Sequence, residues 1–465
     1  MPPESSLEAF YNGHGDLTET SLPSGKSVKY AHDNLGNVIK TTLAPGTSEQ
    51  TVISEILTWD GMRRPLTVKD GEGKITTYTY DLMGRTLTIT NHLGHKTQYT
   101  YNLDGQLHTV READNIQPPN FAINTPPLPN STRTYDDLHR LKTERDGKNQ
   151  TITYNYDAAG QMISYIDAKG ATFSFQYDLL GRQTRRTEPD FTFQTWSYDN
   201  AGRVEDHTKA DGIIIRHHYE NPQRDELTRT TYNGGTPDRS YEYTTFGQLH
   251  IASNAHSTVT FDYDAAGRKT VEIQAHQGLP NTQRFRYFYD GDGNLDYHER
   301  PDLSTVDYAY NERNLLEKLT AEAAPPVAEY KYNGRNQLNE TKVENGLFTA
   351  TRAYDDAARL TGITHAGITE TTAYQLTDDG RRENITRNGQ QETYTYDPAR
   401  QVASASIPLT AGTRTNGYQY DAAANRSSAT TNGVTTSYFA KSKISQGNSR
   451  TFLLPRGILR VGSGE

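Results

Sequence analysis

Apolar and polar residues alternate with a period of two along most of this chain. In residues 75–90, ITTYTYDLMGRTLTIT, Tyr78 and Tyr80 alternate with threonines, and Leu87 and Ile89 do so again further on. A period of two predicts strands with two distinct faces. Between them, Asp81 can accept hydrogen bonds from amides two residues on, and a glycine at the fourth position suits a type I turn closed by a left-handed residue. The segment is therefore predicted to form a bulged β-hairpin.

The same tyrosine–aspartate turn, called the YD turn below, recurs through the chain. Four consecutive steps from Tyr135 to Tyr219 are 21 residues each, and most other steps are 20 to 27 residues. Self-similarity at a fixed period predicts one supersecondary unit copied many times. The first copies are degenerate, and the turn after Tyr374 has two extra residues. The 19 anchor residues that precede the turns are Tyr11, His32, Trp59, Tyr80, Tyr101, Tyr135, Tyr156, Tyr177, Tyr198, Tyr219, Tyr243, Tyr263, Tyr289, Tyr310, Tyr332, Tyr354, Tyr374, Tyr396 and Tyr420.

A second aromatic residue often lies two positions before the anchor, as Tyr78 does before Tyr80. Such pairs share one face, so successive hairpins are predicted to form aromatic ladders across the sheet. Many turns close with arginine, for example in YDLLGR. We expect this arginine near the anchor tyrosine of its own hairpin, where a cation–π contact would add ~0.5–1 kcal/mol per copy. The arginines in question are Arg85, Arg182, Arg203 and Arg268.

The hairpin count predicts the overall shape. With strands about 4.8 Å apart, the stacked hairpins would extend on the order of 180 Å. Twisted open sheets rarely exceed ~10 strands, so a flat sheet is excluded and the ribbon must curl. The predicted fold is all-β: tandem β-hairpin repeats in a curled or spiral, solenoid-like β-shell that is hollow, an open fragment of a full shell.

Interruptions of the pattern suggest four regions. We expect repeats over residues 1–111, a proline-rich loop over 112–133, further repeats over 134–440, and a basic non-repeat tail over 441–465. Prolines at this density do not join a β-ladder, so the loop is expected at the surface. The apolar residues of the tail, Ile458 and Leu459 among them, could cap the last sheet edge.

Composition narrows the function classes. Only 33% of residues are hydrophobic, yet 31 are tyrosines, which suits a thin core with water close by. The net charge is −9 and both signs are interspersed, so the sequence does not predict a basic surface that would bind nucleic acid. The chain has no cysteine, no apolar run of membrane-spanning length and no signal peptide. Export would then need a specialised secretion system, or the chain is part of a longer protein.

Two segments invite a metal site. Asp290–Asp296 (DGDGNLD) looks like a calcium loop, but Leu295 and Pro301 stand where an EF-hand needs Gly and Glu, so we interpret it as a solvated turn. His217 and His218 are neighbours on a strand and should point to opposite faces. No nucleophile elbow or phosphate-binding loop is present. We therefore predict no catalytic residue, no cofactor and no metal, and expect the chain not to be an enzyme.

The unit Tyr-Asp-x-x-Gly-Arg resembles the YD-repeat (Rhs-repeat) family over roughly Tyr11 to Phe439. That family includes bacterial Rhs polymorphic toxins, C components of insecticidal toxin complexes and the repeat region of teneurins. The resemblance implies a spiral β-shell that, in the bacterial toxins, encloses a C-terminal toxin cut free by self-cleavage at an Asp-Pro-x-Gly segment. This sequence departs from the pattern, because Asp397-Pro398-Ala399-Arg400 lacks the glycine and is the turn after Tyr396.

Three hypotheses for function follow. The first is a non-enzymatic shell segment of a secreted or cell-surface toxin, whose partner is a toxin polypeptide or a neighbouring shell segment. The second is a cell-surface adhesion module that stacks its tyrosines on glycan. The third is a toxin enzyme such as a nuclease. The direction of the aromatic face separates the first two, since an inward face indicates a container and an outward face indicates recognition.

Overall fold

The structure, a computed structural model, describes residues 7–112, 131–220, 224–322, 326–368, 370–409, 412–439 and 459–460. Over these ranges the chain is all-β apart from one 3-10 turn, Glu344–Gly346 (η1), and has no α-helix. The predicted fold class is confirmed. The proline-rich stretch 113–130 and most of the tail lie outside the described residues, so the four-region division stays a prediction.

The strands of the first part of the chain are β1 Glu8–Tyr11, β2 Leu17–Ser21, β3 Ser27–His32, β4 Val38–Leu43, β5 Thr51–Trp59, β6 Pro65–Asp70, β7 Ile75–Tyr80, β8 Thr86–Thr90, β9 Lys96–Tyr101, β10 Leu107–Glu112, β11 Ser131–Tyr135, β12 Leu141–Asp146, β13 Thr151–Tyr156, β14 Met162–Ile166, β15 Thr172–Tyr177, β16 Gln183–Thr187, β17 Phe193–Tyr198, β18 Val204–Thr208, β19 Ile214–His218 and β20 Arg229–Tyr232. The remaining strands are β21 Arg239–Tyr243, β22 Leu249–Asn254, β23 Ser257–Tyr263, β24 Lys269–His276, β25 Gln283–Tyr289, β26 Leu295–Glu299, β27 Thr305–Tyr310, β28 Leu316–Ala321, β29 Pro326–Tyr332, β30 Leu338–Val343, β31 Phe348–Tyr354, β32 Leu360–Ala366, β33 Glu370–Leu376, β34 Arg382–Arg387, β35 Gln390–Tyr396, β36 Val402–Leu409, β37 Gly412–Tyr420, β38 Arg426–Thr431, β39 Val434–Phe439 and β40 Leu459–Arg460.

Each strand pairs antiparallel with the next strand in chain order, so the described chain is one long meander. In a typical YD hairpin, β7 and β8, the register shifts by one residue between Thr79 and Tyr80. Gly84 closes the turn with φ of 88°, in the left-handed region that glycine adopts without steric cost. The predicted bulged hairpin is confirmed. The turns between successive hairpins, called linking turns below, lie at the opposite edge of the sheet.

One anchor was misplaced by the sequence alignment. Strand β33 continues to Leu376, which occupies the anchor position, and Tyr374 lies two residues before it. The reason is that Thr377 replaces the turn aspartate: its hydroxyl accepts the amide of Arg381 at 2.9 Å. Threonine forms such side-chain turns as aspartate does, and this places the turn two residues later than the tyrosine predicts.

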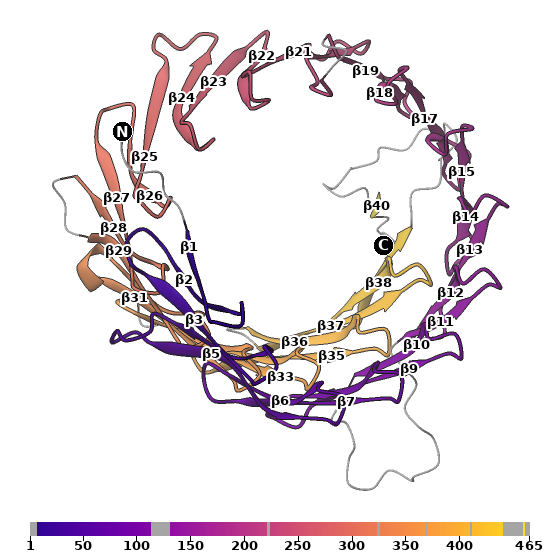
Figure 1. Cartoon of the computed structure of the whole chain (residues 1–465). Helices are drawn as coiled ribbons and strands as arrows, with labels where there is room; N and C mark the ends of the chain where they lie inside the picture. Colours follow the sequence, from indigo (N-terminus) through magenta and orange to yellow (C-terminus); the bar gives the residue numbers. More distant parts are fainter. Residues whose placement is uncertain are drawn as a thin grey trace, which may run out of the picture.

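The meander curls into a spiral, as the strand count requires. Viewed along the axis in Figure 1, it passes down the lower left from β1 to β5, along the bottom to β7, up the right side to β15, across the top and down the left side to β31. It then returns along the bottom as β33–β38, so the spiral completes more than one turn and remains open. The short strand β40 pairs with β39, with Leu459 opposite Phe439, which agrees with a tail that caps the last edge.

The two spiral turns touch along a line that we call the seam. On one side are linking turns of the first spiral turn, at residues 22–26, 70–74, 91–95, 146–150 and 167–171. On the other side are YD turns of the second spiral turn, at 290–294, 333–337, 355–359, 377–381, 397–401 and 421–425. Hydrogen bonds across the seam join residues 253 to 288 positions apart in the sequence.

Candidate functional site

The YD turn is fastened by its aspartate. In the turn after Tyr177, Asp178 Oδ1 accepts the amides of Leu180 at 2.9 Å and Arg182 at 3.0 Å, and its Oδ2 accepts Arg182 Nε at 2.7 Å. The amide and guanidinium of Arg182 hold the pKa of Asp178 below its ordinary value. One carboxylate therefore orders both the turn backbone and the arginine.

The same arginine then reaches the following repeat. The Arg182 guanidinium lies 4.4 Å from the ring centre of Tyr198, the next anchor, and not over Tyr177 of its own hairpin. The expected contact within one hairpin is thus wrong: the salt bridge to Asp178 directs the side chain along the sheet, toward the adjacent hairpin. The same link recurs in the pairs Arg64–Tyr80, Arg85–Tyr101, Arg140–Tyr156, Arg203–Tyr219, Arg268–Tyr289 and Arg381–Tyr396.

The anchor tyrosines also bond backward along the sheet. Tyr198 Oη donates to the carbonyl oxygen of Gln183 at 2.7 Å, on the return strand of the preceding hairpin. Burial raises the pKa of Tyr198, and the charge of Asp178 raises it further, while Arg182 opposes them. An anchor ring such as that of Tyr198 is therefore held between two repeats and connects them.

A further set of rings lies on the same face of the sheet as the anchors. The rings of Tyr165 and Phe173 stack with centres 4.5 Å apart, and Trp196 stacks on His207 at 4.9 Å. These pairs stand directly opposite each other on neighbouring strands. The predicted aromatic ladders are confirmed over these strands.

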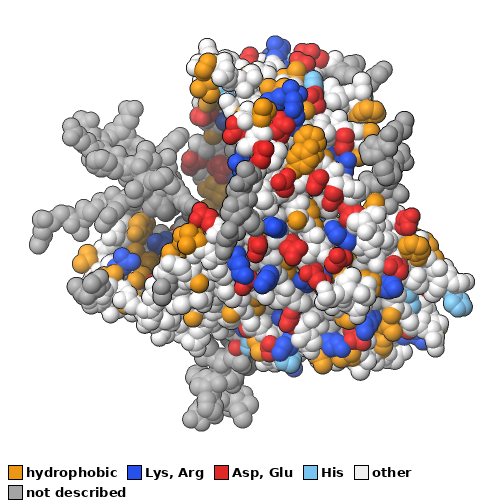
Figure 2. All heavy atoms as spheres, turned by 90° about the vertical axis from the view of Figure 1, so that its left-hand side faces the viewer, with side chains coloured by type: hydrophobic (Ala, Val, Ile, Leu, Met, Phe, Trp, Pro, Cys, Tyr) orange, Lys and Arg blue, Asp and Glu red, His pale blue; other side chains and the backbone are white. Residues whose placement is uncertain are grey.

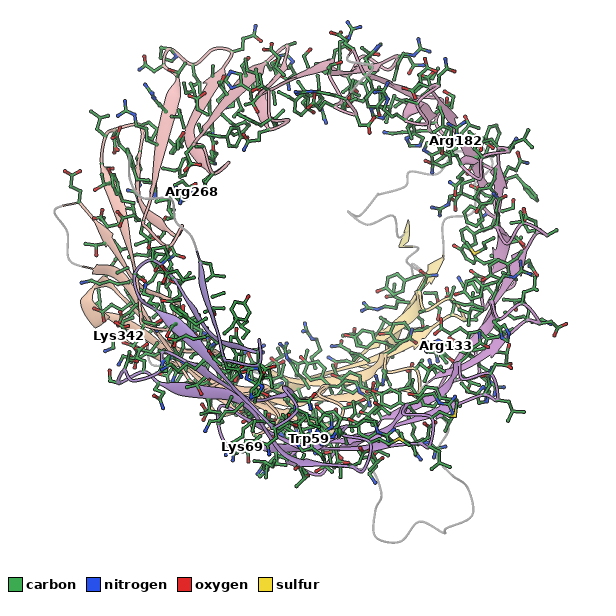
Figure 3. All side chains as sticks on the ribbon, viewed as in Figure 1. Trp59, Lys69, Arg133, Arg182, Arg268 and Lys342 are labelled. Atoms are coloured by element: carbon green, nitrogen blue, oxygen red, sulfur yellow. The ribbon has the colours of Figure 1, made fainter. Side chains whose placement is uncertain are left out.

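Figure 3 and the register together show that this face points inward. Arg133, two residues before the anchor Tyr135 and on its face, lies on the inner side of the wall. Lys342 is paired with Glu329, on the face opposite Tyr330, and lies on the outer side. The sequence left this direction open because alternation defines two faces without saying which is enclosed.

The aromatic side chains of the inner face are only partly buried. The rings of Tyr154, Tyr165, Phe173 and Trp196 are all half-buried, and no large side chain among the described residues is fully buried. In Figure 1, β40 lies inside the circle of the wall, near the end of the second spiral turn. Over the described residues the wall is one sheet thick, and its aromatic lining faces the inside of the spiral.

The outer face has different chemistry. Figure 2 shows basic and acidic side chains interspersed over the part of the wall that includes β25–β30. Two of these pairs are Arg286–Glu299 at 2.9 Å and Lys331–Glu340 at 3.0 Å. Elsewhere threonines bond across strands, as Thr79 and Thr88 do at 2.7 Å. A mixed, patch-free charge distribution favours solubility of this side.

The suspected calcium loop is part of the seam. Asp292 Oδ1 accepts the amide of Ser24 at 2.8 Å, and its side chain is only 2% exposed. Burial raises the pKa of Asp292, but hydrogen bonds from Ser24 and the charge of Lys26 outweigh it and lower the pKa. The interpretation as a solvated turn is therefore wrong for Asp292. The error arose because the partner is 268 residues away.

Pairs between acidic side chains and lysine or histidine continue along the seam. Lys74 contacts Asp356 at 2.7 Å, and His95 contacts Asp378 at 2.8 Å. Further along, the seam joins Lys148 to Asp397 and Lys169 to Asp421. The backbones also meet closely: a Cβ on Gly71 would stand 2.0 Å from the carbonyl oxygen of Gly334. The seam is thus polar, and tight enough at this point to require glycine.

A cavity of about 540 Å³ lies where the second spiral turn covers the lining. Ile152, Tyr165 and Phe173 line it from the first spiral turn, and residues 422–425 line it from the second. Its walls combine rings with the carboxylates of Glu144 and Asp146. The cavity is continuous with the aromatic lining, so it belongs to the inner face.

Other chemistry is sparse in the part of the chain that the structure describes. No cluster of three or more His, Asp or Glu residues could hold a metal ion there. His217 and His218 are on opposite faces of β19, with His218 Nε2 3.2 Å from Thr231 Oγ1, as predicted. Within these ranges no helix has the length and apolar character needed to cross a membrane.

Comparisons with known proteins agree with this geometry. A family model described as Teneurin YD-shell matches residues 130–291, and one described as RHS Repeat matches residues 11–48. No curated protein matches the chain. Among solved structures, "Crystal Structure of TcdB2-TccC3" is 15% identical with a TM-score of 0.67, covering 94% of this chain and 26% of that chain.

A second solved structure is the Photorhabdus luminescens Tc holotoxin pore, 14% identical with a TM-score of 0.72, covering 93% of this chain and 26% of that chain. A third, TcdB2-TccC3 without its hypervariable C-terminal region, is 15% identical with a TM-score of 0.70, covering 94% and 26%. At these identities the likeness concerns the fold alone. The chain spans about a quarter of the length of each of these proteins.

Proposed function

Because this chain is built of YD/RHS repeats, we propose that it is a non-enzymatic segment of a shell wall that encloses a toxin polypeptide. Its partners would be that polypeptide and neighbouring shell segments. It would act outside the cell that makes it, as a secreted or surface component. The named toxin-complex structures support this proposal by their fold.

The observation that carries the proposal is the inward direction of the aromatic face. Half-buried rings such as Tyr165, Phe173 and Trp196 lie on the inner face, where ion pairs such as Arg133–Glu144 also lie. A non-native polypeptide exposes apolar side chains, and these gain by contact with rings that are still partly hydrated. A wall with this polarity suits a container for an unfolded or partly folded guest.

The position of β40 also supports the proposal that the wall encloses a polypeptide. In the view along the axis, this last described strand lies within the circle of the wall, next to β39. A guest joined after the repeats would therefore start on the inner side. The adhesion alternative required an outward aromatic face, so we do not develop it.

A protease-protection experiment tests the proposal. A protease-sensitive reporter of about 50 residues is fused after Glu465 in one protein and ahead of Met1 in a matched control. We expect the C-terminal reporter to be digested at least about tenfold more slowly than the N-terminal one. Equal digestion of both reporters, with the wall itself intact on a gel, would contradict enclosure.

A further inference from the structure

Large apolar side chains are exposed along both free edges of the spiral. At one edge they are the tips of YD turns in the first spiral turn, and Leu103 and Leu179 are exposed to 106% and 105%. At the other edge they belong to linking turns of the later hairpins, where Leu303 is exposed to 69% and Val434 to 72%. We call the first edge the YD rim, formed by Leu35, Met62, Leu82, Leu103, Leu138 and Leu179. The linking rim comprises Leu303, Leu347, Phe348, Ile368, Leu409 and Val434.

The seam shows what the same two kinds of edge do when they are covered. There the YD-turn tips are Asp292, Arg335, Asp356, Asp379, Pro398 and Ala423, with no leucine, methionine or aromatic residue among them. They meet linking turns through Lys74, His95 and similar polar groups. Tips that are covered at the seam are therefore charged, proline or alanine, whereas the six YD-rim tips named above are leucine or methionine. Other turns of the first spiral turn, such as residues 157–161 with Ala158 and Ala159, carry no such residue. Single exposed apolar residues such as Ile163 are ordinary in the wall, but a row of strongly exposed ones along an edge marks an interaction surface.

The two rims are geometrically matched. Both are made by hairpins of the same kind, so the turns along each rim repeat every two strands, about 10 Å. The seam demonstrates that YD turns of this chain fit against its linking turns, with backbones close enough to require Gly71. Placing the YD rim of one molecule on the linking rim of another repeats that contact, with apolar tips in place of ion pairs.

We propose that the YD rim binds the linking rim of a second copy of this chain, so that copies stack head to tail along the spiral axis. The contact is heterologous, since the two copies contribute different surfaces, and each stacked pair still presents one free rim of each kind. Association therefore continues beyond the dimer as concentration rises. This property is independent of what the lumen contains.

The test measures the mass of the full chain by light scattering and sedimentation over a range of concentrations. Leu103→Glu with Leu179→Glu charges the YD rim, and Leu303→Glu with Val434→Glu charges the linking rim. All four side chains are exposed, so the replacements remove few contacts within the chain. Ile163→Glu is the control, because Ile163 is also exposed, to 40%, but lies in the wall.

We expect the unaltered chain and Ile163→Glu to associate alike, and each rim variant to associate at least about tenfold more weakly, since charge is costly in a desolvated contact. Mixing the two rim variants should restore dimers and stop there, because each still has one intact rim. A single-chain mass for the unaltered protein at every concentration would overturn the proposal. So would dimers of one rim variant alone, or association only with a different shell protein.

Discussion

The guanidinium of Arg85 lies 4.5 Å from the ring centre of Tyr101, one repeat further along the chain. Its Nε is held at 2.6 Å by Asp81 in its own turn. The aspartate, arginine and tyrosine of the repeat therefore connect neighbouring hairpins, so each hairpin is stabilised by the one beside it. This is how a sheet with almost no buried core is held together.

Replacing the arginine that closes a YD turn should weaken the contact between two neighbouring repeats. For Arg182→Ala we expect a loss of about 0.5–1 kcal/mol in unfolding free energy, the size of an exposed cation–π contact. Urea denaturation followed by circular dichroism measures it. The control is Arg229→Ala on the outer face, which should change little. Equal losses in both variants would contradict the role given to the stack.

The hydroxyl of an anchor tyrosine should contribute separately from its ring. Tyr101 Oη donates to the carbonyl oxygen of Thr86 at 2.8 Å, so Tyr101→Phe should cost about 0.5–1.5 kcal/mol. Tyr11 is 63% exposed, and Tyr11→Phe should be nearly neutral. Thermal melting of both variants measures the difference. Identical melting temperatures for Tyr101→Phe and Tyr11→Phe would refute the prediction.

The seam should fail when its closest approach is blocked. In Gly71→Ala the new methyl group would stand 2.0 Å from the carbonyl oxygen of Gly334, and both groups are backbone. We expect the two spiral turns to separate locally, at a cost of about 1–3 kcal/mol, with a larger radius of gyration in X-ray scattering. Gly61→Ala meets nothing within 4 Å and is the matched control.

Acid should weaken the seam. The pKa values of Asp292 and Asp421 are lowered, because hydrogen bonds and charge from Ser24, Lys26 and Lys169 outweigh burial. A carboxylate with a lowered pKa stabilises the fold above its ordinary pKa of about 3.9, and this contribution is lost as pH falls through the lower, folded value. The melting temperature should therefore fall steeply below about pH 4. The Asp292→Asn variant should have a lower melting temperature at neutral pH, and that temperature should fall less on acidification.

Alkali should ionise the half-buried Tyr394 late. Burial, followed by the hydrogen bond and charge of Glu392, raises the pKa of Tyr394 to about 12. The stability linked to this group is present below pH 10 and is lost as pH rises through 12. Absorbance titration near 295 nm should show a late step that Tyr394→Phe removes. A titration complete by pH 11 in the folded chain would contradict this.

The sequence was informative where the cause is local. The alternation around Tyr80 and the Asp81–Gly84 turn specify the hairpin, and the hairpin count excludes a flat sheet. It was uninformative where the partner is distant, as for Asp292 and Ser24, since neither carries a local signal of the other. Thr377 is an intermediate case. Its hydroxyl takes the place of the turn aspartate, so the signal is local, but the turn begins two residues later than Tyr374 predicts.

Cysteine cross-linking across the seam tests the spiral most directly. The chain has no cysteine, so Ser24→Cys with Asp292→Cys introduces one pair at a contact between residues 268 positions apart. Ser24→Cys with Asp264→Cys, in a YD turn away from the seam, is the control. The account predicts rapid disulfide formation and faster migration on a non-reducing gel for the first pair alone. No cross-link in the first pair, or equal cross-linking in both, would contradict a spiral whose second turn lies against its first.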